Sequence, residues 1–241
     1  MMIDKSSENG KLNINKVSLS IVMPCFNEEN TIGICIKSAQ KVIDDLKIDG
    51  EILVVDNNST DRSASIAAKE GARVIVEINR GYGYASRCGI REAKGEIIIL
   101  IDADTTYDFN DIKEMYHMLS DDPYDVVIGN RFCEKMEKGA MPISHRLGVK
   151  ALSYLGRKRF KTDVYDFHSG IRGISKKASN KLIFNTTGME FATEMIAESA
   201  KNGLRIGQMQ VSLLRCRCDR RSKLRTVRDG IRHLRYIITA V

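Results

Sequence analysis

The sequence contains no tryptophan, only three prolines among its 241 residues and no long apolar run. A helix that spans a membrane needs roughly 18 or more consecutive apolar residues, so no such helix is predicted. The opening segment, residues 1–16, is polar and lacks the apolar core that signal peptides carry. We therefore expect a polar N-terminal extension, no secretion and a cytoplasmic location.

The cysteines are few and scattered. None of them forms a CxxC pair or lies beside histidines at the spacing of zinc ligands. The six cysteines are at positions 25, 35, 88, 133, 216 and 218. The sequence therefore indicates neither a zinc site nor a disulfide framework, and it fits a reducing compartment. A hydrophobic content of 43% is enough for a substantial core, so we expect one domain over residues 17–225.

The net charge of +7 is concentrated in one stretch near the end of the chain. Between residues 215 and 235 there are nine Lys or Arg and two Asp, whereas the remaining chain has 29 basic and 29 acidic residues. A local excess of this kind favours a local anionic partner over a generally basic protein.

Short apolar runs rich in β-branched residues alternate with segments of helical periodicity. The predicted strands are 17–23, 51–55, 73–77, 96–101, 125–129 and 205–214. Helices are predicted from residue 31, over 62–70, up to 93, and over 146–154, 188–202 and 226–241. This alternation predicts an α/β fold, in which a mainly parallel central sheet carries helices on both faces.

Polar side chains follow three of the predicted strands, and ligands bind at this carboxyl edge of open parallel sheets. Asp102-Ala103-Asp104 is the sharpest of these motifs. Its carboxylates suit a hard cation such as Mg²⁺, which shares its coordination with phosphate oxygens. A solvated acidic turn is the alternative interpretation of so short a motif.

The polar motifs, taken in order, resemble the family 2 glycosyltransferases, which have the GT-A fold. The nearest resemblance is to the dolichyl-phosphate mannosyltransferase-like branch, which includes enzymes that charge polyprenyl phosphates. It is carried by residues 24–29, 54–61, 79–83, 102–104, 129–132, 166–173 and 221–224.

This resemblance implies a role for each matching residue. The nucleotide-sugar pocket would be lined by Pro24, Asn27, Glu28, Asp56, Arg80, Asp102 and Ala103. Asp104 and Asp102 would hold Mg²⁺ or Mn²⁺, and the acceptor phosphate would meet Arg131, Arg172 and Lys223. Catalytic roles would fall to Asp166, Arg131 and Arg172. The implied reaction is inverting transfer of one hexose from UDP- or GDP-hexose to a polyprenyl phosphate at the cytoplasmic membrane face.

The sequence departs from the family pattern at Asn57, where many relatives have a second aspartate. Because there is no tryptophan, the Q/RxxRW motif of processive polymerases is absent, which favours single transfer. A soluble hydroxyl, glycan or peptide acceptor stays open and would need a general base. Candidates for the base are Asp166, then Glu190 or Glu194. A non-catalytic module that binds nucleotide-sugar or nucleic acid is a further alternative.

The predicted C-terminal helix, residues 226–241, is basic and amphipathic. Its apolar positions recur every three or four residues, at Val227, Ile231, Leu234, Ile238 and Val241, with Arg228, Arg232 and Arg235 on a neighbouring face. Such a helix can lie on an anionic membrane surface, or it can pack its apolar stripe on the core. Nucleic acid is not expected, because the stretch has one aromatic residue and no nucleic-acid-binding motif.

Overall fold

The computed structural model describes residues 17–215 and 226–240. The strands are β1 (Leu19–Cys25), β2 (Gly50–Asp56), β3 (Arg73–Val76), β4 (Ile97–Leu100), β5 (Val126–Asn130), β6 (Arg172–Ser175) and β7 (Ile206–Gln210). The helices are α1 (Ile32–Leu46), α2 (Ser63–Lys69), α3 (Tyr82–Glu92), α4 (Asp111–Ser120), α5 (Ile143–Phe160), α6 (Lys176–Ser179), α7 (Phe191–Lys201) and α8 (Thr226–Thr239). Lys223 and the predicted N-terminal extension lie outside the described residues.

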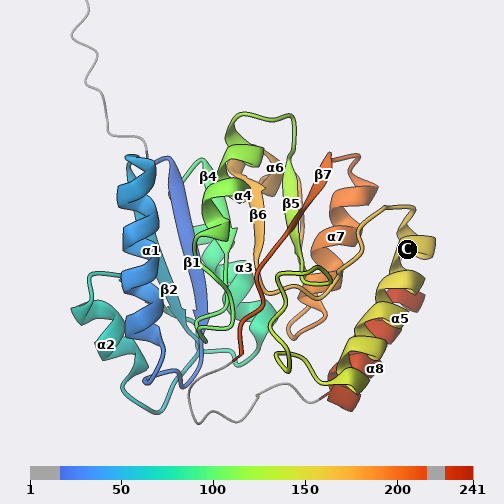
Figure 1. The fold of residues 1–241 in the computed structure, drawn as a ribbon, viewed down its shortest axis with the longest axis horizontal. Coiled ribbons are helices and arrows are strands. Elements are labelled where there is room, and N and C mark those ends of the chain that lie inside the picture. The colour runs from blue at the N-terminus through green and yellow to red at the C-terminus, as the bar shows by residue number, and fades with distance from the viewer. Residues whose placement is uncertain (1–16, 216–225, 241) are drawn as a thin grey trace, which may run out of the picture.

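One seven-stranded sheet runs through the molecule in the order β3-β2-β1-β4-β6-β5-β7 (Figure 1). Neighbouring strands are parallel except around β6, which is antiparallel to both β4 and β5. The prediction of an α/β fold with a mainly parallel sheet is therefore confirmed.

Alternation along the central strands divides the core into two layers. Ile21 and Met23 of β1 pack with residues of α1 and α4 on one face, whereas Val22 packs with residues of α3 and α7 on the other. Successive side chains of a strand point to opposite faces, so a continuous apolar run is needed where both faces are covered. This explains why β1 and β4 read as unbroken hydrophobic segments.

Three elements of the structure were not predicted from the sequence. Strand β6 has the sequence RGIS, which holds a single large apolar residue and so gives no strand signal. Its place in the sheet comes from pairing, with Ile174 opposite Ile98 and Arg172 opposite Leu100. Helices α4 and α6 were also missed, and α5 is longer than the predicted 146–154.

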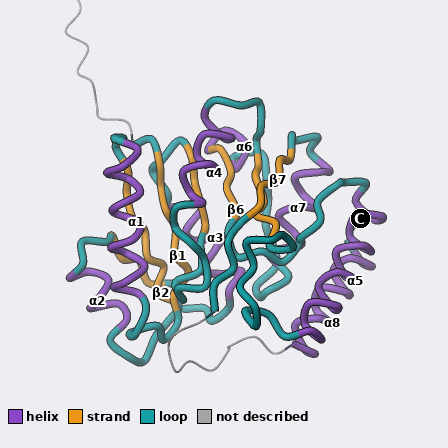
Figure 2. The backbone as a smooth tube through the Cα atoms, viewed as in Figure 1, coloured by secondary structure: helices purple, strands orange, loops and turns teal. Residues whose placement is uncertain are grey.

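Helices α5 and α8 lie side by side at the edge of the molecule farthest from α1 and α2 (Figures 1 and 2). Among the described residues, no helix combines the length and the apolar content that crossing a bilayer requires. The expected C-terminal helix is present as α8, but its apolar stripe does not pack on the core. Ile231 and Ile238 are largely exposed, whereas His233 and Ile237 are buried.

Candidate nucleotide-sugar site

The carboxyl ends of β1, β2 and β4 lie next to one another. Cys25 is in register with Asp56, and the amide of Ile101 continues the β1–β4 ladder by donating to the carbonyl of Val22. The loops that follow these three strands therefore meet at one edge of the sheet, as predicted. They carry the residues assigned to the nucleotide-sugar pocket.

The loops after β1 and β2 are tied together through Asn27. Its side-chain oxygen accepts a hydrogen bond from the Thr60 amide at 2.7 Å, and its own amide donates to Ser59 Oγ at 3.0 Å. Asn27 adopts a left-handed backbone conformation, with φ of 51°, which asparagine tolerates better than most residues. The buried Glu28 is held similarly, since its amide donates to Ser63 Oγ at 2.7 Å.

Asn57 links the loop after β2 to the loop after β3. Its side-chain nitrogen donates to the carbonyls of Glu77 and Asn79, and its oxygen accepts from the amide of Gly81. An aspartate has no donor to offer these two carbonyls, so the asparagine fits this loop arrangement. The departure from the family pattern at this position thus has a structural cause that the sequence alone did not reveal.

The buried Asp56 offers one unsatisfied oxygen. Its Oδ2 accepts from the amide of Ser59 at 3.2 Å, but its Oδ1 has no hydrogen-bond partner among the described residues. A buried acceptor left unpaired costs about 1–3 kcal/mol, so it is suited to a donor that a ligand brings. The N–H at the pairing edge of a uracil or guanine base is such a donor. Arg80 lies over the ring of Phe26, 5.0 Å from its centroid, at the same edge.

The acidic motif lies immediately after β4. The carbonyl of Ala103 accepts from Thr31 Oγ1 at 2.8 Å, and Asp104 Oδ1 accepts from the amide of Thr106 at 3.1 Å. Thr105 has a φ of 61°, so the chain turns sharply after the two carboxylates. Residues two apart in a continuing strand would share one face, but β4 ends at Leu100, so alternation alone does not set the directions of these two carboxylates.

Asp102 is packed against Gly170. A Cβ placed at Gly170 would lie 1.9 Å from Asp102 Oδ2, so only glycine lets the stretch before β6 approach this carboxylate. Tyr107 also lies here, and its hydroxyl accepts from the Gly170 amide at 2.7 Å. Burial raises the pKa of Tyr107, which keeps the phenol neutral. Neither Gly170 nor Tyr107 was singled out from the sequence, although Gly170 stood within a quoted motif.

The residues present fit a divalent cation that is shared with a substrate. Within the described ranges there is no group of three or more His, Cys, Asp or Glu side chains able to hold a metal ion alone. Asp102 and Asp104 can supply one or two carboxylate oxygens, and a nucleotide diphosphate can supply others. Mg²⁺ is commonly bound in this way, through one or two carboxylates together with substrate phosphates.

Arg131 and Asp166 form a buried ion pair. Arg131 Nε lies 2.7 Å from Asp166 Oδ2 and its Nη2 lies 2.8 Å from Oδ1, so the pair is bidentate. Burial opposes the charge of Arg131, but the carboxylate outweighs it and raises the pKa of the guanidinium. Asp166 also accepts from the amides of Arg131 and His168. This geometry is unsuited to a general base, because both oxygens already accept hydrogen bonds.

Arg172 is fully buried at the start of β6. Its Nη1 donates to the carbonyl of Ala192 at 2.8 Å, and its Nη2 donates to the carbonyl of Ser169. Burial lowers the pKa of this guanidinium, and its Nε has no partner within the described residues. The structure therefore does not bring Arg172 to the surface where an acceptor phosphate would arrive, and that role stays a prediction. The reason is that β6, which the sequence did not reveal, carries the residue into the sheet.

Helix α8 closes over this buried region. Arg232 Nη2 lies 2.5 Å from Glu190 Oε1, and the His233 ring lies 4.2 Å from that of His168. Burial lowers the pKa of His233 to about 4 and that of His168 well below its usual range. Glu194 is used to order the loop before α7, because it accepts from the amides of Asn185 and Thr186.

A mainly parallel sheet that brings Asp56, Asp102 and Asp104 to its carboxyl edge is the arrangement expected of enzymes that use nucleotide-sugars. The sequence profile described as Glycosyl transferase family 2 matches residues 20–183. The chain belongs to glycosyltransferase family 2 and has the GT-A fold.

Relatives with named functions agree with this membership. The low-salt glycan biosynthesis hexosyltransferase Agl6 of Haloferax volcanii is 35% identical over 92% of this chain, which spans 53% of that protein. The dolichyl-phosphate hexose transferase of the same organism is 28% identical over 80% of this chain and 81% of its own length. Among solved structures, glucosyl-3-phosphoglycerate synthase from Mycobacterium tuberculosis with Mn²⁺, UDP-glucose and phosphoglyceric acid aligns with a TM-score of 0.73. It shares 23% identity over 92% of this chain and 78% of its own, which shows the fold.

Proposed function

We propose that this protein is an inverting glycosyltransferase that moves one hexose from UDP- or GDP-hexose to a polyprenyl phosphate. The transfer would take place at the cytoplasmic face of a membrane, with Mg²⁺ or Mn²⁺ at Asp102 and Asp104. A relative named as a dolichyl-phosphate hexose transferase supports the lipid acceptor, and a solved structure that holds Mn²⁺ with UDP-glucose supports the cation.

The donor end of the proposal rests on complementary chemistry. The unpaired Oδ1 of Asp56 would accept from the base, and Arg80 would stack at the mouth of the pocket. Asn27 and Glu28 would shape the same pocket through the loop contacts described above, and Pro24 would line it from β1, where it is in register with Val55. A bound cation would neutralise charge on the diphosphate as it leaves, which is its usual contribution to such chemistry.

The choice of a phosphate acceptor is supported by the hydrogen-bond partners of the carboxylates that could serve as a general base. Asp166 is occupied by Arg131 and Glu194 by backbone amides, whereas Glu190 pairs with Arg232 through Oε1 and its buried Oε2 has no partner among the described residues. Despite the desolvation by burial, hydrogen bonding and charge from Arg232 lower the pKa of Glu190, which makes it a weaker base. A hydroxyl acceptor needs a base, whereas a phosphate oxygen arrives as an anion. The arrangement therefore favours a phosphate acceptor.

Catalysis then depends on positioning and on charge screening. Arg131 is the described cation best placed for the acceptor, because Asp166 fixes its guanidinium and it lies close to the acidic motif and to His145. Lys223 and Arg172 are the further phosphate ligands of this proposal. Arginine suits the task because its planar fork meets phosphate oxygens in pairs.

The test is release of nucleotide diphosphate from UDP- and GDP-hexoses, with Mg²⁺ or Mn²⁺, in the presence and absence of a short polyprenyl phosphate. We expect release that depends on the lipid phosphate and is abolished by Asp104→Ala. The matched control is Lys37→Gln on the outer side of α1, where the side chain is 71% exposed. Transfer to a soluble hydroxyl acceptor, with no effect of the lipid phosphate, would overturn the acceptor and leave the family membership intact.

A further inference from the structure

Helix α8 presents its apolar stripe to the outside. Val227 is 76% exposed, Ile231 is 61% exposed and Ile238 is 67% exposed, whereas a stripe of this kind normally packs on a core. The face that packs inward is largely polar, because Arg232 pairs with Glu190 and His233 Nδ1 lies 2.8 Å from Thr193 Oγ1, and Ile237 is its buried apolar residue. The outward stripe is therefore left for a partner.

Helix α5 continues this outward surface. It runs beside α8, and its Arg159 Nη2 donates to the carbonyl of Ala240 near the C-terminal end of α8. Ile143, Leu147 and Tyr154 are exposed on α5 and recur at positions that share one side of a helix. The side of α5 that packs inward carries Val149, which is buried. Two neighbouring helices thus expose apolar rows away from the core, and we call this surface the α5–α8 face.

The charge on the α5–α8 face is predominantly positive. Residues 143–161 contain six Lys or Arg and no Asp or Glu, and α8 contains a single acidic residue, Asp229. The six cations lie in the same segment as the exposed apolar residues of α5. They are Arg146, Lys150, Arg157, Lys158, Arg159 and Lys161. This surface is therefore apolar and basic together, which is the composition of helices that lie in a membrane interface.

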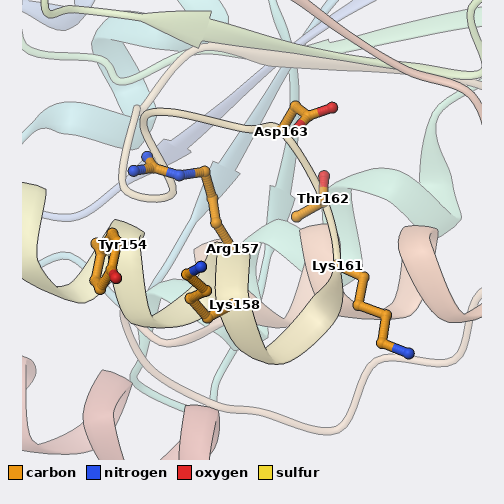
Figure 3. A pocket seen from close by; sticks show the side chains of 6 residues that line it. All are labelled: Tyr154, Arg157, Lys158, Lys161, Thr162 and Asp163. Atoms are coloured by element: carbon orange, nitrogen blue, oxygen red, sulfur yellow. The ribbon is translucent and has the colours of Figure 1, made fainter.

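The C-terminal end of α5 forms a small pocket of about 240 Å³. It is lined by Tyr154, Arg157, Lys158, Lys161, Thr162 and Asp163, as Figure 3 shows. The Arg157 guanidinium lies 4.7 Å from the ring centroid of Tyr165 and 5.8 Å from that of Tyr154. Three cations and one carboxylate line the pocket, so its net charge suits an anion the size of a phosphate group. Tyrosine beside Lys and Arg is also the pairing found at the level of lipid headgroups.

We propose that the α5–α8 face docks on an anionic lipid surface, and that the pocket at the end of α5 takes the phosphate of a lipid headgroup. Nucleic acid would use the cations but would leave the apolar rows exposed to water. A second copy of this chain would bring two faces of the same positive charge together, which disfavours self-association. A lipid surface satisfies both the apolar rows and the cations.

The inference rests on the proposed function in one respect, because a polyprenyl phosphate acceptor requires the enzyme to work at a membrane. Its test measures binding to lipid and not transfer, so the two can fail separately. Sugar transfer without vesicle binding would contradict the docking face alone. Vesicle binding without transfer to a lipid phosphate would contradict the proposed acceptor alone.

The experiment is cosedimentation of the full chain with vesicles of phosphatidylcholine, alone or mixed with phosphatidylglycerol. We expect binding only to the mixed vesicles, with an affinity that falls as salt rises. Replacing Arg157, Lys158 and Lys161 together by Gln should weaken it by about 100-fold, since each basic residue at a lipid surface contributes about fivefold. The matched control replaces Lys37, Lys41 and Lys69 by Gln and so removes three cations from the opposite edge of the molecule. It should bind the mixed vesicles much more tightly than the first triple variant does.

A second variant separates the apolar contribution from the charge. Ile231→Ser with Ile238→Ser leaves the net charge unchanged and removes apolar groups that already face outward, so the fold should be retained. We expect it to weaken binding to the mixed vesicles, with an unchanged circular dichroism spectrum. The proposal is overturned if the wild type does not bind the mixed vesicles, or if both triple variants lose affinity equally. It is also overturned if Ile231→Ser with Ile238→Ser converts a dimer to monomers and leaves vesicle binding unchanged.

Discussion

Replacing Asp166 by Asn should destabilise the protein strongly. The carboxylate accepts four hydrogen bonds, two from the Arg131 guanidinium and one each from the amides of Arg131 and His168. Asn keeps the shape but removes the charge and offers one oxygen where two were used. Arg131 is then left buried with its charge uncompensated. Breaking a buried ion pair from one side costs about 3–5 kcal/mol.

The assay is equilibrium unfolding in urea, together with a thermal melt. For a domain of this size each kcal/mol shifts the midpoint by about 2–4 °C, so a decrease of roughly 6–20 °C is expected. Lys37→Gln serves as the control, because it removes an exposed ion pair and should change the free energy of unfolding by less than about 1 kcal/mol. If Asp166→Asn unfolds within about 1 kcal/mol of the wild type, the charge of this pair is not what holds the region together.

A double replacement tests the cause of the loss. Arg131→Met with Asp166→Leu removes both charges and leaves no orphan, so it should recover part of the stability that Asp166→Asn loses. Transfer activity should not recover, because the acceptor phosphate would then lack Arg131. A double variant less stable than Asp166→Asn would show that packing, and not the unpaired charge, dominates.

Three further outcomes are expected. Gly170→Ala should weaken Mn²⁺-dependent UDP binding by at least about tenfold, because its Cβ would displace Asp102; calorimetry measures the affinity. The control is Gly148→Ala, which has no atom near its added Cβ and should bind UDP as the wild type does. Chelation with EDTA should weaken UDP binding to the wild type yet hardly affect Asp104→Asn, and an equal effect on both would remove the metal from this motif. His233 ionises near pH 6.5 when unfolded and at about 4 when folded. The unfolded state therefore binds more protons between these values, and the free energy of unfolding should fall by about 3 kcal/mol as the pH drops through this range; in urea titrations His233→Gln should flatten that slope.

The sequence predicted the elements whose signal is local. Strands such as β1 and β4 are continuous apolar runs, and the edge where their loops meet follows from a parallel sheet. Asp56 and the acidic motif lie where that reasoning placed them. Strand β6 was missed because its stability comes from pairing with β4 and β5 and not from its own composition.

The orientation of side chains was the part that the sequence could not supply. Arg131 and Asp166 were both expected at the site, yet nothing in the sequence shows that they saturate each other. The apolar period of α8 was visible, but whether it faces the core or the outside depends on what lies beneath. Glu190, Thr193 and His168 make that underlying surface polar, so the helix turns its polar edge inward.

The reversed direction of β6 joins the two halves of the reaction site. A parallel strand delivers the residues after its end to the binding edge, whereas an antiparallel strand delivers the residues before its start. Asp102 and Asp104 follow β4, and residues 166–171 precede β6, so both groups reach the same edge and meet at Gly170. The acidic motif and residues 166–171 are thus fastened to two adjacent strands, and their relative position is as rigid as the sheet. A change of side chain just before β6 should therefore also shift Asp102, because the two stretches are in contact at Gly170.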